Sequence, residues 1–332
     1  MTQSTRPTAR STDWSCSKRK LWLTGRFAAT RLGDRLDGPA RVSDEARASR
    51  CRQGALSVWF YAPYGDRLYG KFVSPSIVEI RGLSKQYGAF SALSELDLDV
   101  PRGELFALLG PNGAGKTTTM RMLMGILKAS AGSARINGLD CFRDRVAVKR
   151  LVGFLPDEPV FHDYLRGIEI IRFVGGMHGL SASEINQRAW PLIERIELSD
   201  ATEEYAVNYS RGMKKKLGLV CSLLHEPELL ILDEPTSGLD PIATRGLNAL
   251  LLEKVHAGMT VLLSSHLLDQ VQRLCRRMAI ISRGRLAAVG TLEELRQRAN
   301  AESSLEEIFF AVAAEAGARA TSSQPELPSP ES

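Results

Sequence analysis

The feature that most constrains the fold of this chain is a glycine-rich turn that connects an apolar run to a segment expected to be helical. Residues 104–109 read Glu-Leu-Phe-Ala-Leu-Leu, which is typical of a strand buried on both faces. Residues 110–117 read Gly-Pro-Asn-Gly-Ala-Gly-Lys-Thr and match the pattern G-x-x-x-x-G-K-[ST]. A helix is expected over residues 116–127. This order of strand, turn and helix predicts an α/β fold with a phosphate-binding loop at the end of the strand.

The rest of the chain alternates between strand and helix in the same way. Helices are expected over residues 241–256 and 266–275, and repeated alternation favours a parallel sheet covered by helices. Residues 157–224 are mostly helical in pattern, with breaks at Gly175-Gly176 and Ser181, and are expected to form an inserted subdomain. Further strands are expected at residues 77–80, 96–100, 134–136, 151–155, 229–232, 260–263 and 278–282.

The charge of the chain is distributed unevenly. Residues 1–75 carry 14 Lys and Arg against 6 Asp and Glu, a net charge of +8, and the remaining residues carry 29 against 32, a net charge of −3. The main domain is therefore not basic, and no specific nucleic-acid partner is expected. Residues 1–75 show no sustained helical or strand periodicity in their apolar residues. They are expected to be a disordered extension, or translated upstream sequence if the start codon lies near Val73, with a transit peptide as the alternative.

The main domain is expected over residues 76–311, followed by a flexible tail at 312–332 that is rich in Ser, Thr, Pro and Glu. The five cysteines are scattered and show neither metal-ligand spacing nor a disulfide framework. This cysteine usage favours a reducing compartment.

The loop at residues 110–117 carries groups that can bind a phosphate. Its glycines let backbone N–H groups turn inward around phosphate oxygens, and the next helix adds a positive dipole end. Lys116 is expected to reach the β- and γ-phosphates and the Thr117 hydroxyl to bind Mg²⁺. A glycine-rich turn without a ligand is the alternative. The candidate nucleotide-binding residues are Gly110, Pro111, Asn112, Gly113, Ala114, Gly115, Lys116, Thr117 and Thr118.

A second chemical motif lies at residues 229–234, where four apolar residues precede two carboxylates. A buried strand there would bring Asp233 to the same sheet edge as the phosphate loop. Asp233 is expected to hold Mg²⁺ through its water shell. Glu234 is expected to orient and deprotonate an attacking water. The alternative is that these acids only cap the next helix.

Three shorter segments are further candidate functional motifs. Residues 209–213 read Tyr-Ser-Arg-Gly-Met and precede three lysines, and Ser210 can cap a helix whose positive end is also an anion site. Residues 237–240 read Ser-Gly-Leu-Asp, and His266 follows the strand expected at 260–263. Taken alone, such a lysine run indicates a solvated helix face, and a lone histidine at a strand end is usually a polar surface residue.

In chain order, the five motifs resemble those of the nucleotide-binding subunit of an ATP-binding cassette (ABC) transporter. They lie at residues 110–117, 210–212, 229–234, 237–240 and 265–266. The resemblance covers about residues 77–311. The form of residues 209–213, with Ser-Leu-Glu-Glu-Ile-Phe at 304–309, is similar to exporter-type subunits. The resemblance implies an α/β P-loop ATPase core with a parallel sheet, an antiparallel β portion near the N-terminus, and a helical subdomain at about residues 157–224.

The resemblance also implies roles for single residues. Tyr87 corresponds to the aromatic residue that stacks on adenine, with a core aromatic at a strand end as the alternative. Ser210 and Gly212 would contact the γ-phosphate bound to the opposite protomer, and Asp240 would communicate across the dimer interface. His266 would contact the γ-phosphate of its own protomer and, with the catalytic Glu234, help to hold the attacking water.

Three positions depart from the family pattern. Arg211 stands where the family's signature usually has a second glycine, and Met213 where it has glutamine. Asp157 stands where the family usually has a glutamine that reaches Mg²⁺ and water. Because a carboxylate binds Mg²⁺ directly or through water, Asp157 is expected in the metal site. The alternative is that it only caps the following turn.

The resemblance implies an ATP-binding and ATP-hydrolysing subunit, with ATP and Mg²⁺ as ligands. It implies a homodimer or a paired ATPase subunit, and a separate integral-membrane permease whose export it powers from the cytoplasmic face of the cell membrane. The sequence has no run of 18 apolar residues, so no membrane span is expected in this chain. The alternative is a soluble ABC-type ATPase that acts on ribosomes or DNA. Such proteins usually have two cassettes or a long coiled coil, neither of which this sequence shows.

Overall fold

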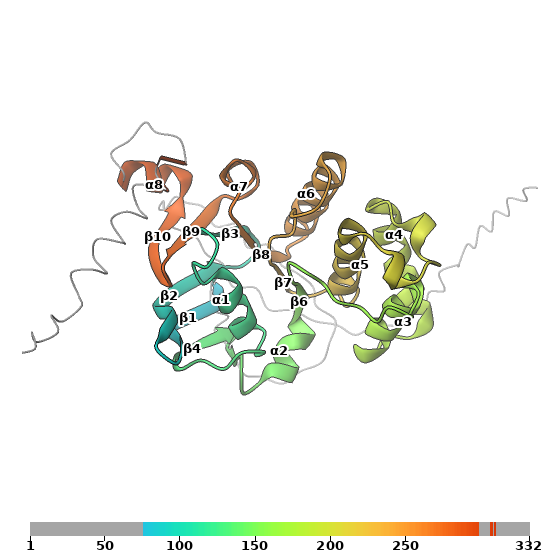
Figure 1. Ribbon diagram of the computed structural model, residues 1–332, viewed down its shortest axis with the longest axis horizontal. Helices are drawn as coiled ribbons and strands as arrows, with labels where there is room; N and C mark the ends of the chain where they lie inside the picture. Colours follow the sequence, from blue (N-terminus) through green and yellow to red (C-terminus); the bar gives the residue numbers. More distant parts are fainter. Residues whose placement is uncertain (1–75, 299–305, 308, 310–332) are drawn as a thin grey trace, which may run out of the picture. The chain divides into compact units, whose positions relative to one another are not determined.

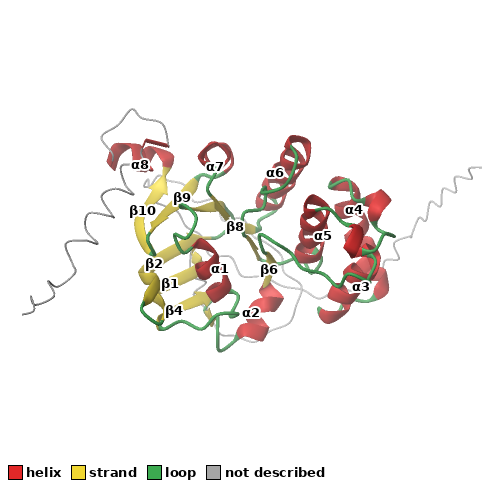
Figure 2. Cartoon of the chain, viewed as in Figure 1, coloured by secondary structure: helices red, strands yellow, loops and turns green. Residues whose placement is uncertain are grey.

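The computed structural model describes residues 76–298, 306–307 and 309. The predicted extension at 1–75 and the predicted tail at 312–332 lie outside these residues. The described part contains two β-sheets with helices packed around them (Figures 1 and 2). Among its helices, none combines the length and the apolar character that crossing a bilayer would need.

The larger sheet has six strands, in the spatial order β10-β9-β3-β8-β7-β6. They are β3 (Leu105–Leu109), β6 (Val152–Leu155), β7 (Leu229–Leu232), β8 (Thr260–Ser265), β9 (Arg277–Ser282) and β10 (Arg285–Thr291). The pairs β3–β8, β3–β9, β6–β7 and β7–β8 are parallel, and β10 is an antiparallel edge strand on β9. The predicted parallel sheet is confirmed, with β10 as an addition.

The sequence did not predict β10 because its residues, Arg-Leu-Ala-Ala-Val-Gly-Thr, alternate only weakly. The strand forms because a tight turn folds it back onto β9. Arg283 and Gly284, which make the turn, have φ angles of 48° and 76°. Positive φ at both central residues is the geometry that matches the twist of a two-stranded ribbon.

The smaller sheet is antiparallel and has the order β2-β1-β4-β5. Its strands are β1 (Ser76–Tyr87), β2 (Phe90–Pro101), β4 (Ala131–Ile136) and β5 (Leu139–Asp140). This sheet confirms the antiparallel β portion expected near the start of the main domain. β1 and β2 each extend over 12 residues, well beyond the predicted cores, because several register shifts let them stay paired up to the hairpin turn.

Eight α-helices connect or cover these strands in the described residues. They are α1 (Lys116–Leu123), α2 (Arg145–Leu151), α3 (Gly167–Met177), α4 (Ala182–Arg195), α5 (Arg211–Leu223), α6 (Pro241–His256), α7 (Leu268–Leu274) and α8 (Leu292–Arg298). The predicted helix over 241–256 is confirmed as α6. The helix expected over 116–127 is shorter, because Gly125 adopts a φ of 63° and ends it.

The helical segment predicted at residues 157–224 contains α3, α4 and α5, which pack against one another (Figure 1). The predicted break at Ser181 is confirmed, since Ser181 caps α4. The second predicted break comes one residue later than Gly175-Gly176, because α3 ends at Met177. α3 continues through both glycines, and an added Cβ on Gly175 would lie 2.5 Å from Cγ1 of Ile185. Glycine is used here for the close approach of two helices.

The central sheet is buried on both faces. Leu105, Ala107 and Leu109 of β3 belong to one apolar cluster, which includes the helical segment, α6 and α7. The alternating Phe106 and Leu108 belong to a second cluster, which includes α1 and the antiparallel sheet. This alternation fixes the orientation of β3 and therefore directs its carboxyl end, with the loop that follows, to one edge of the sheet.

Candidate functional site

The phosphate loop connects β3 to α1 and depends on glycine at two positions. Gly113 and Gly115 have φ angles of 78° and 109°, in the region that other residues avoid. Gly115 also lacks space for a side chain, since an added Cβ would lie 2.9 Å from the carbonyl oxygen of Ala92. α1 then begins at Lys116 with no side-chain cap. An uncapped helix start after such a loop is suited to an anion.

The loop forms one wall of a hollow of about 290 Å³. The hollow brings together residues from four separate parts of the chain: the hairpin turn between β1 and β2, the phosphate loop, the segment after β6 and the end of β7. It is lined by Tyr87, Phe90, Ala92, Pro111, Asn112, Gly113, Ala114, Gly115, Lys116, Thr117, Thr118, Asp157 and Glu234.

Lys116 lies at the floor of this hollow and is almost fully buried. Its Nζ donates to the carbonyl oxygens of Gly110, at 2.7 Å, and Pro111, at 3.3 Å. The same atom lies 3.4 Å from Oε1 of Glu234. The ammonium is therefore held at the phosphate loop and faces the carboxylate predicted to act on water.

Glu234 lies between two basic side chains. Opposite Lys116, its Oε2 is 2.9 Å from Nδ1 of His266. Its other oxygen, Oε1, is buried and has no hydrogen-bond partner among the described residues. The side chain is 13% exposed. The carboxylate thus has one oxygen hydrogen-bonded to His266 and one that is buried near the Lys116 ammonium, at 3.4 Å from Nζ.

Asp233 is held by a residue that the sequence analysis did not single out. Its side chain is buried, and Oδ1 accepts a hydrogen bond of 2.6 Å from the Oγ of Ser264. The same Oγ accepts a hydrogen bond of 2.9 Å from the backbone N–H of Glu234. Ser264 ends an apolar strand in the sequence, and a hydroxyl at the end of a parallel strand beside a carboxylate pair was the signal that could have found it.

Asp157 lies beside two cations of α5. Its Oδ1 is 3.2 Å from Nη2 of Arg211 and 3.1 Å from Nζ of Lys215. The interpretation of the lysine run as a solvated face is wrong for Lys215, whose side chain is only 1% exposed because α5 turns it toward the core. Burial lowers the pKa of Lys215, and the Asp157 carboxylate opposes that shift. That Asp157 also binds Mg²⁺ stays a prediction.

Ser210, Gly212 and Asp240 are not among the described residues that line the hollow. Ser210 caps α5, and its Oγ accepts a hydrogen bond from the N–H of Met213. Asp240 caps α6 by accepting from the N–H groups of Ile242 and Ala243, at 2.9 and 2.8 Å. These bonds, chiefly the one from Ala243, lower the pKa of Asp240.

Gly212 lies close to the loop before α6, where an added Cβ would be 3.3 Å from the carbonyl oxygen of Gly238. The segments at 209–213 and 237–240, far apart in the sequence, are thus neighbours. Their predicted contacts with a second protomer stay predictions.

Two aromatic side chains line the hollow at the hairpin turn. Tyr87 and Phe90 are cross-strand partners and are 50% and 64% exposed. Tyr87 is therefore not a core residue, which excludes the alternative considered for it. Phe90 was not predicted, although an aromatic residue three positions after the first, across a turn, was a usable signal. Both rings offer an apolar face to a planar ligand.

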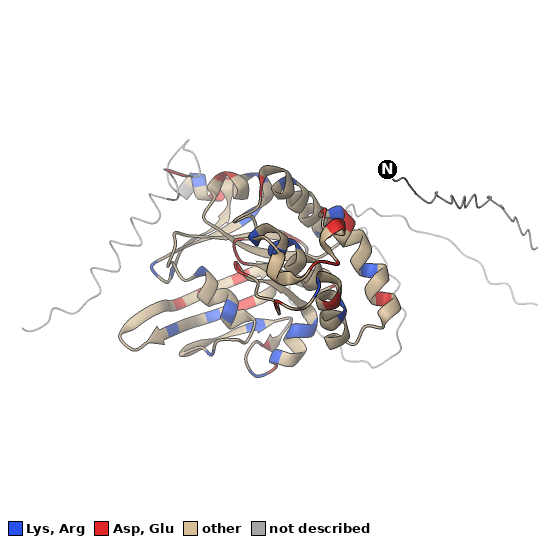
Figure 3. Cartoon of the chain, turned by 45° about the vertical axis from the view of Figure 1, so that its right-hand side comes forward, with Lys and Arg blue, Asp and Glu red and all other residues tan. Residues whose placement is uncertain are grey.

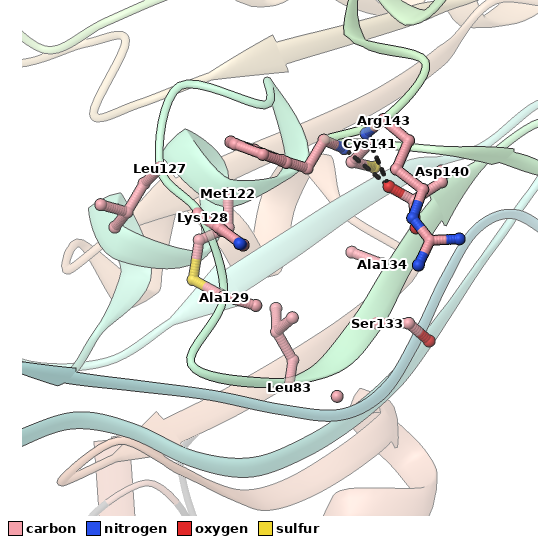
Figure 4. A pocket seen from close by; sticks show the side chains of 12 residues that line it. Leu83, Met122, Leu127, Lys128, Ala129, Ser133, Ala134, Asp140, Cys141 and Arg143 are labelled. Atoms are coloured by element: carbon pink, nitrogen blue, oxygen red, sulfur yellow. Dashed lines mark hydrogen bonds between the residues drawn. The ribbon is translucent and has the colours of Figure 1, made fainter.

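A second hollow, of about 170 Å³, lies beside β4 and the loop after α1 (Figure 4). Its residues include Cys141, whose pKa burial raises to about 12. The carboxylate of Asp140 there accepts from the backbone N–H groups of Phe142 and Arg143, at 3.0 and 2.8 Å. Its lining lacks a phosphate loop and a carboxylate pair.

Comparison with known proteins agrees with this site. Residues 93–237 match the ABC transporter family. The chain is 38% identical over 224 residues to the daunorubicin resistance ATP-binding protein DrrA3 of Streptomyces coeruleorubidus, with 68% of this chain and 71% of that protein covered. It is 33% identical over 222 residues to the linearmycin resistance ATP-binding protein LnrL of Bacillus subtilis (strain 168), with 67% and 71% covered.

The fold is similar to that of solved ATP-binding subunits. A structure of the ATP-binding subunit of an ABC transporter is 34% identical, has a TM-score of 0.68, and is matched over 71% of this chain and 99% of that chain. A nucleotide-free ATP-binding cassette, at 21% identity and a TM-score of 0.61, shares the fold. The chain therefore belongs to the family of ABC transporter ATP-binding proteins.

Proposed function

We propose that this chain hydrolyses ATP in the hollow beside its phosphate loop. The observation that carries this proposal is the position of Glu234, whose carboxylate lines the hollow between Lys116 and His266. A carboxylate with one oriented oxygen can accept the proton of an attacking water, and His266 keeps it in place. Lys116, on the opposite side, supplies a positive charge for phosphate oxygens.

The side chains also suit Mg²⁺. Mg²⁺ prefers oxygen ligands and is usually bound by one or two carboxylates together with substrate phosphates. Thr117 and Asp157 line the hollow, and Asp233 is buried directly before Glu234, which also lines it. We propose that the Thr117 hydroxyl, Asp233 and Asp157 hold the ion. When bound, Mg²⁺ would neutralise charge on the transferred phosphoryl group.

We propose that two protomers complete each site. The aromatic ring of Tyr87 would stack on adenine and the phosphate loop would hold the phosphates of one protomer. Ser210 and Gly212 would come from the other protomer, since neither lines the hollow of its own chain in the described residues. Asp240, at the start of α6, would lie at the same interface. Closure around ATP would orient the reacting groups and exclude water.

We further propose that the chain powers export through a separate permease and is held at the membrane by it. Support comes from the relatives, which are named for resistance to daunorubicin and linearmycin. The segment between β6 and α3 also has an exposed apolar hollow, lined by Phe161, His162, Asp163, Tyr164, Leu165 and Phe173. Tyr164 is 88% exposed. This surface would receive a segment of the permease.

The proposal can be tested in membrane vesicles that contain a candidate permease, meaning an integral-membrane protein that co-purifies with this chain. With the full chain and ATP added outside inside-out vesicles, we expect the vesicles to retain the chain and to raise its hydrolysis rate. Daunorubicin, named in the DrrA3 relative, is the first transport probe. A Tyr164→Asp variant should still hydrolyse ATP in the absence of the permease, but the permease should no longer raise its rate. A wild-type rate that is the same with and without permease would refute the coupling.

A further inference from the structure

Lys215 is a buried cation in the middle of α5. Its side chain is 1% exposed, and a lysine is almost never fully buried unless it is paired. Its Nζ donates to Oδ1 of Asp157, at 3.1 Å, and to the backbone carbonyl oxygen of Glu234. One ammonium on α5 thus contacts both the segment after β6, through Asp157, and the backbone of Glu234.

The backbone of Glu234 needs such support. Its φ angle is 45°, in the left-handed region that costs a residue other than glycine about 1–3 kcal/mol. A strained residue keeps this conformation only where its surroundings fix it. Both polar groups of its backbone are hydrogen-bonded: Ser264 accepts from its N–H, and its carbonyl oxygen accepts from the side chain of Lys215 and, at 3.2 Å, from the backbone N–H of Ser237. Lys215 is the charged donor of the two at this oxygen.

Asp157 balances the charge of Lys215. The carboxylate is 40% exposed, whereas the ammonium is buried, so the pair lies at the boundary of the hollow. Arg211, one turn earlier on α5, adds a second contact to the same oxygen and also donates to Oγ of Ser237. Because Arg211 still pairs with Asp157 when Lys215 is neutral, removal of Lys215 does not leave this carboxylate alone.

We propose that Lys215 is a positioning residue for hydrolysis: it holds the backbone of Glu234 in the conformation that directs the carboxylate between Lys116 and His266, with Asp157 as its counter-ion. This proposal rests on the proposed ATP hydrolysis. It assigns Asp157 a role toward Lys215 that is separate from any contact with Mg²⁺. It also gives a common basis to two sequence departures, at Asp157 and Arg211, which lie in the same cluster.

The test compares Lys215→Met with the wild-type chain at saturating Mg²⁺. Methionine fills nearly the same volume but cannot donate a hydrogen bond. Loss of a hydrogen bond from a charged group corresponds to about 10- to 100-fold in rate, so we expect kcat to fall by about that factor. The Kd for ATP should stay within about 2-fold of the wild-type value, because Lys215 does not line the hollow.

Two further variants separate positioning from a structural role. Lys215→Gln keeps an N–H donor without the charge and should recover part of the lost kcat. In a double-mutant cycle at saturating Mg²⁺, the loss of kcat in Asp157→Asn/Lys215→Met should be smaller than the product of the losses in the two single variants, because the two residues act as a pair. The control is Lys149→Met, which removes an exposed positive charge on α2 and should leave kcat unchanged.

The proposal is overturned if Lys215→Met keeps the wild-type kcat. It is equally overturned if kcat, ATP affinity and melting temperature fall together and Lys215→Gln recovers nothing, since that is the pattern of a structural residue. If Lys215→Met does not fold, Lys215→Gln alone decides: an unchanged kcat, or a joint fall of kcat, ATP affinity and melting temperature, then overturns the proposal. Absence of hydrolysis in the wild-type chain would instead refute the proposed function.

Discussion

Ser264→Ala tests the polar support beneath the two carboxylates of the site. In the native structure its buried hydroxyl donates to Asp233 at 2.6 Å and accepts from the N–H of Glu234 at 2.9 Å. Alanine fits sterically, because it is smaller, but it leaves a buried carboxylate and a backbone donor without this partner.

The two hydrogen bonds set the expected magnitude. A hydrogen bond to a charged group contributes about 1.5–3 kcal/mol and a neutral one about 0.5–1.5 kcal/mol. The free energy of unfolding should therefore fall by about 2–4 kcal/mol. For a domain of this size, each kcal/mol lowers the melting temperature by about 2–4 °C, so we expect a loss of roughly 4–16 °C. Urea denaturation and differential scanning calorimetry measure both quantities.

Ser222→Ala is the matched control. Ser222 is also buried, but its hydroxyl donates only to the carbonyl oxygen of Leu219 within α5, at 2.9 Å. Alanine is a better helix former than serine, so this variant should lose less than about 1 kcal/mol. If Ser264→Ala is no less stable than Ser222→Ala, the argument that Ser264 supports Asp233 and Glu234 is refuted.

Four other predictions follow from the site and the fold. Mixing Lys116→Ala with Ser210→Arg protomers should restore up to about half of the activity per heterodimer, since one composite site then carries neither change; heterodimers without activity would exclude a shared site. Tyr87→Ala should raise the Kd for ATP by about 10-fold, as base stacking contributes about 1–3 kcal/mol, and an unchanged Kd in a fluorescent-nucleotide titration would reject stacking. If Asp157 binds Mg²⁺, Asp157→Asn should raise the Mg²⁺ concentration for half-maximal hydrolysis several-fold; an unchanged midpoint leaves it only the role toward Lys215. Burial, and after it the stacked ring of His178, lower the pKa of His225 from 6.5 to about 4. Because the unfolded chain then binds a proton more readily than the folded chain, the free energy of unfolding should be highest above pH 6.5 and lower by on the order of 1–2 kcal/mol at pH 5. His225→Phe should flatten this dependence, and equal pH profiles in urea melts would contradict the assignment.

The sequence predicted the parts of this fold whose signals are local. The strand, turn and helix around Gly110–Thr117 follow from an apolar run and glycine spacing, and α6 follows from Asp240 and Pro241 at its start. The ends of helices inside the helical segment were harder to predict, because a glycine pair such as Gly175-Gly176 indicates either a helix end or a close contact between two helices. Only the position of Ile185 in the folded chain decides between them.

The same limit applies to the candidate site. Lys116, Asp233 and Glu234 belong to motifs, so the sequence could name them and propose their chemistry. Ser264 and Lys215 do not, because their roles depend on which elements pack against them. The lysine run on α5 shows this most clearly: one of its three side chains is buried against Asp157. Periodicity can place that lysine on an inner face, but it cannot show the partner that makes burial possible.

The distribution of charge outside the site also depends on the fold. In the described part of the chain, Lys and Arg are interspersed with Asp and Glu along helices and strands (Figure 3). Several of them form surface pairs, such as Arg81 with Asp99 and Arg166 with Glu203. Pairs this exposed contribute little to stability.

Hydrolysis of Mg-ATP by the Glu234→Gln chain, measured beside the wild-type chain, tests the central claim most directly. Glutamine keeps the shape of the side chain but cannot accept the proton of water. The account predicts that the variant binds ATP as well as the wild-type chain and accumulates an ATP-bound dimer in light scattering. Its hydrolysis rate should fall by on the order of 10²–10⁴-fold. A variant that turns over ATP at the wild-type rate would contradict the account.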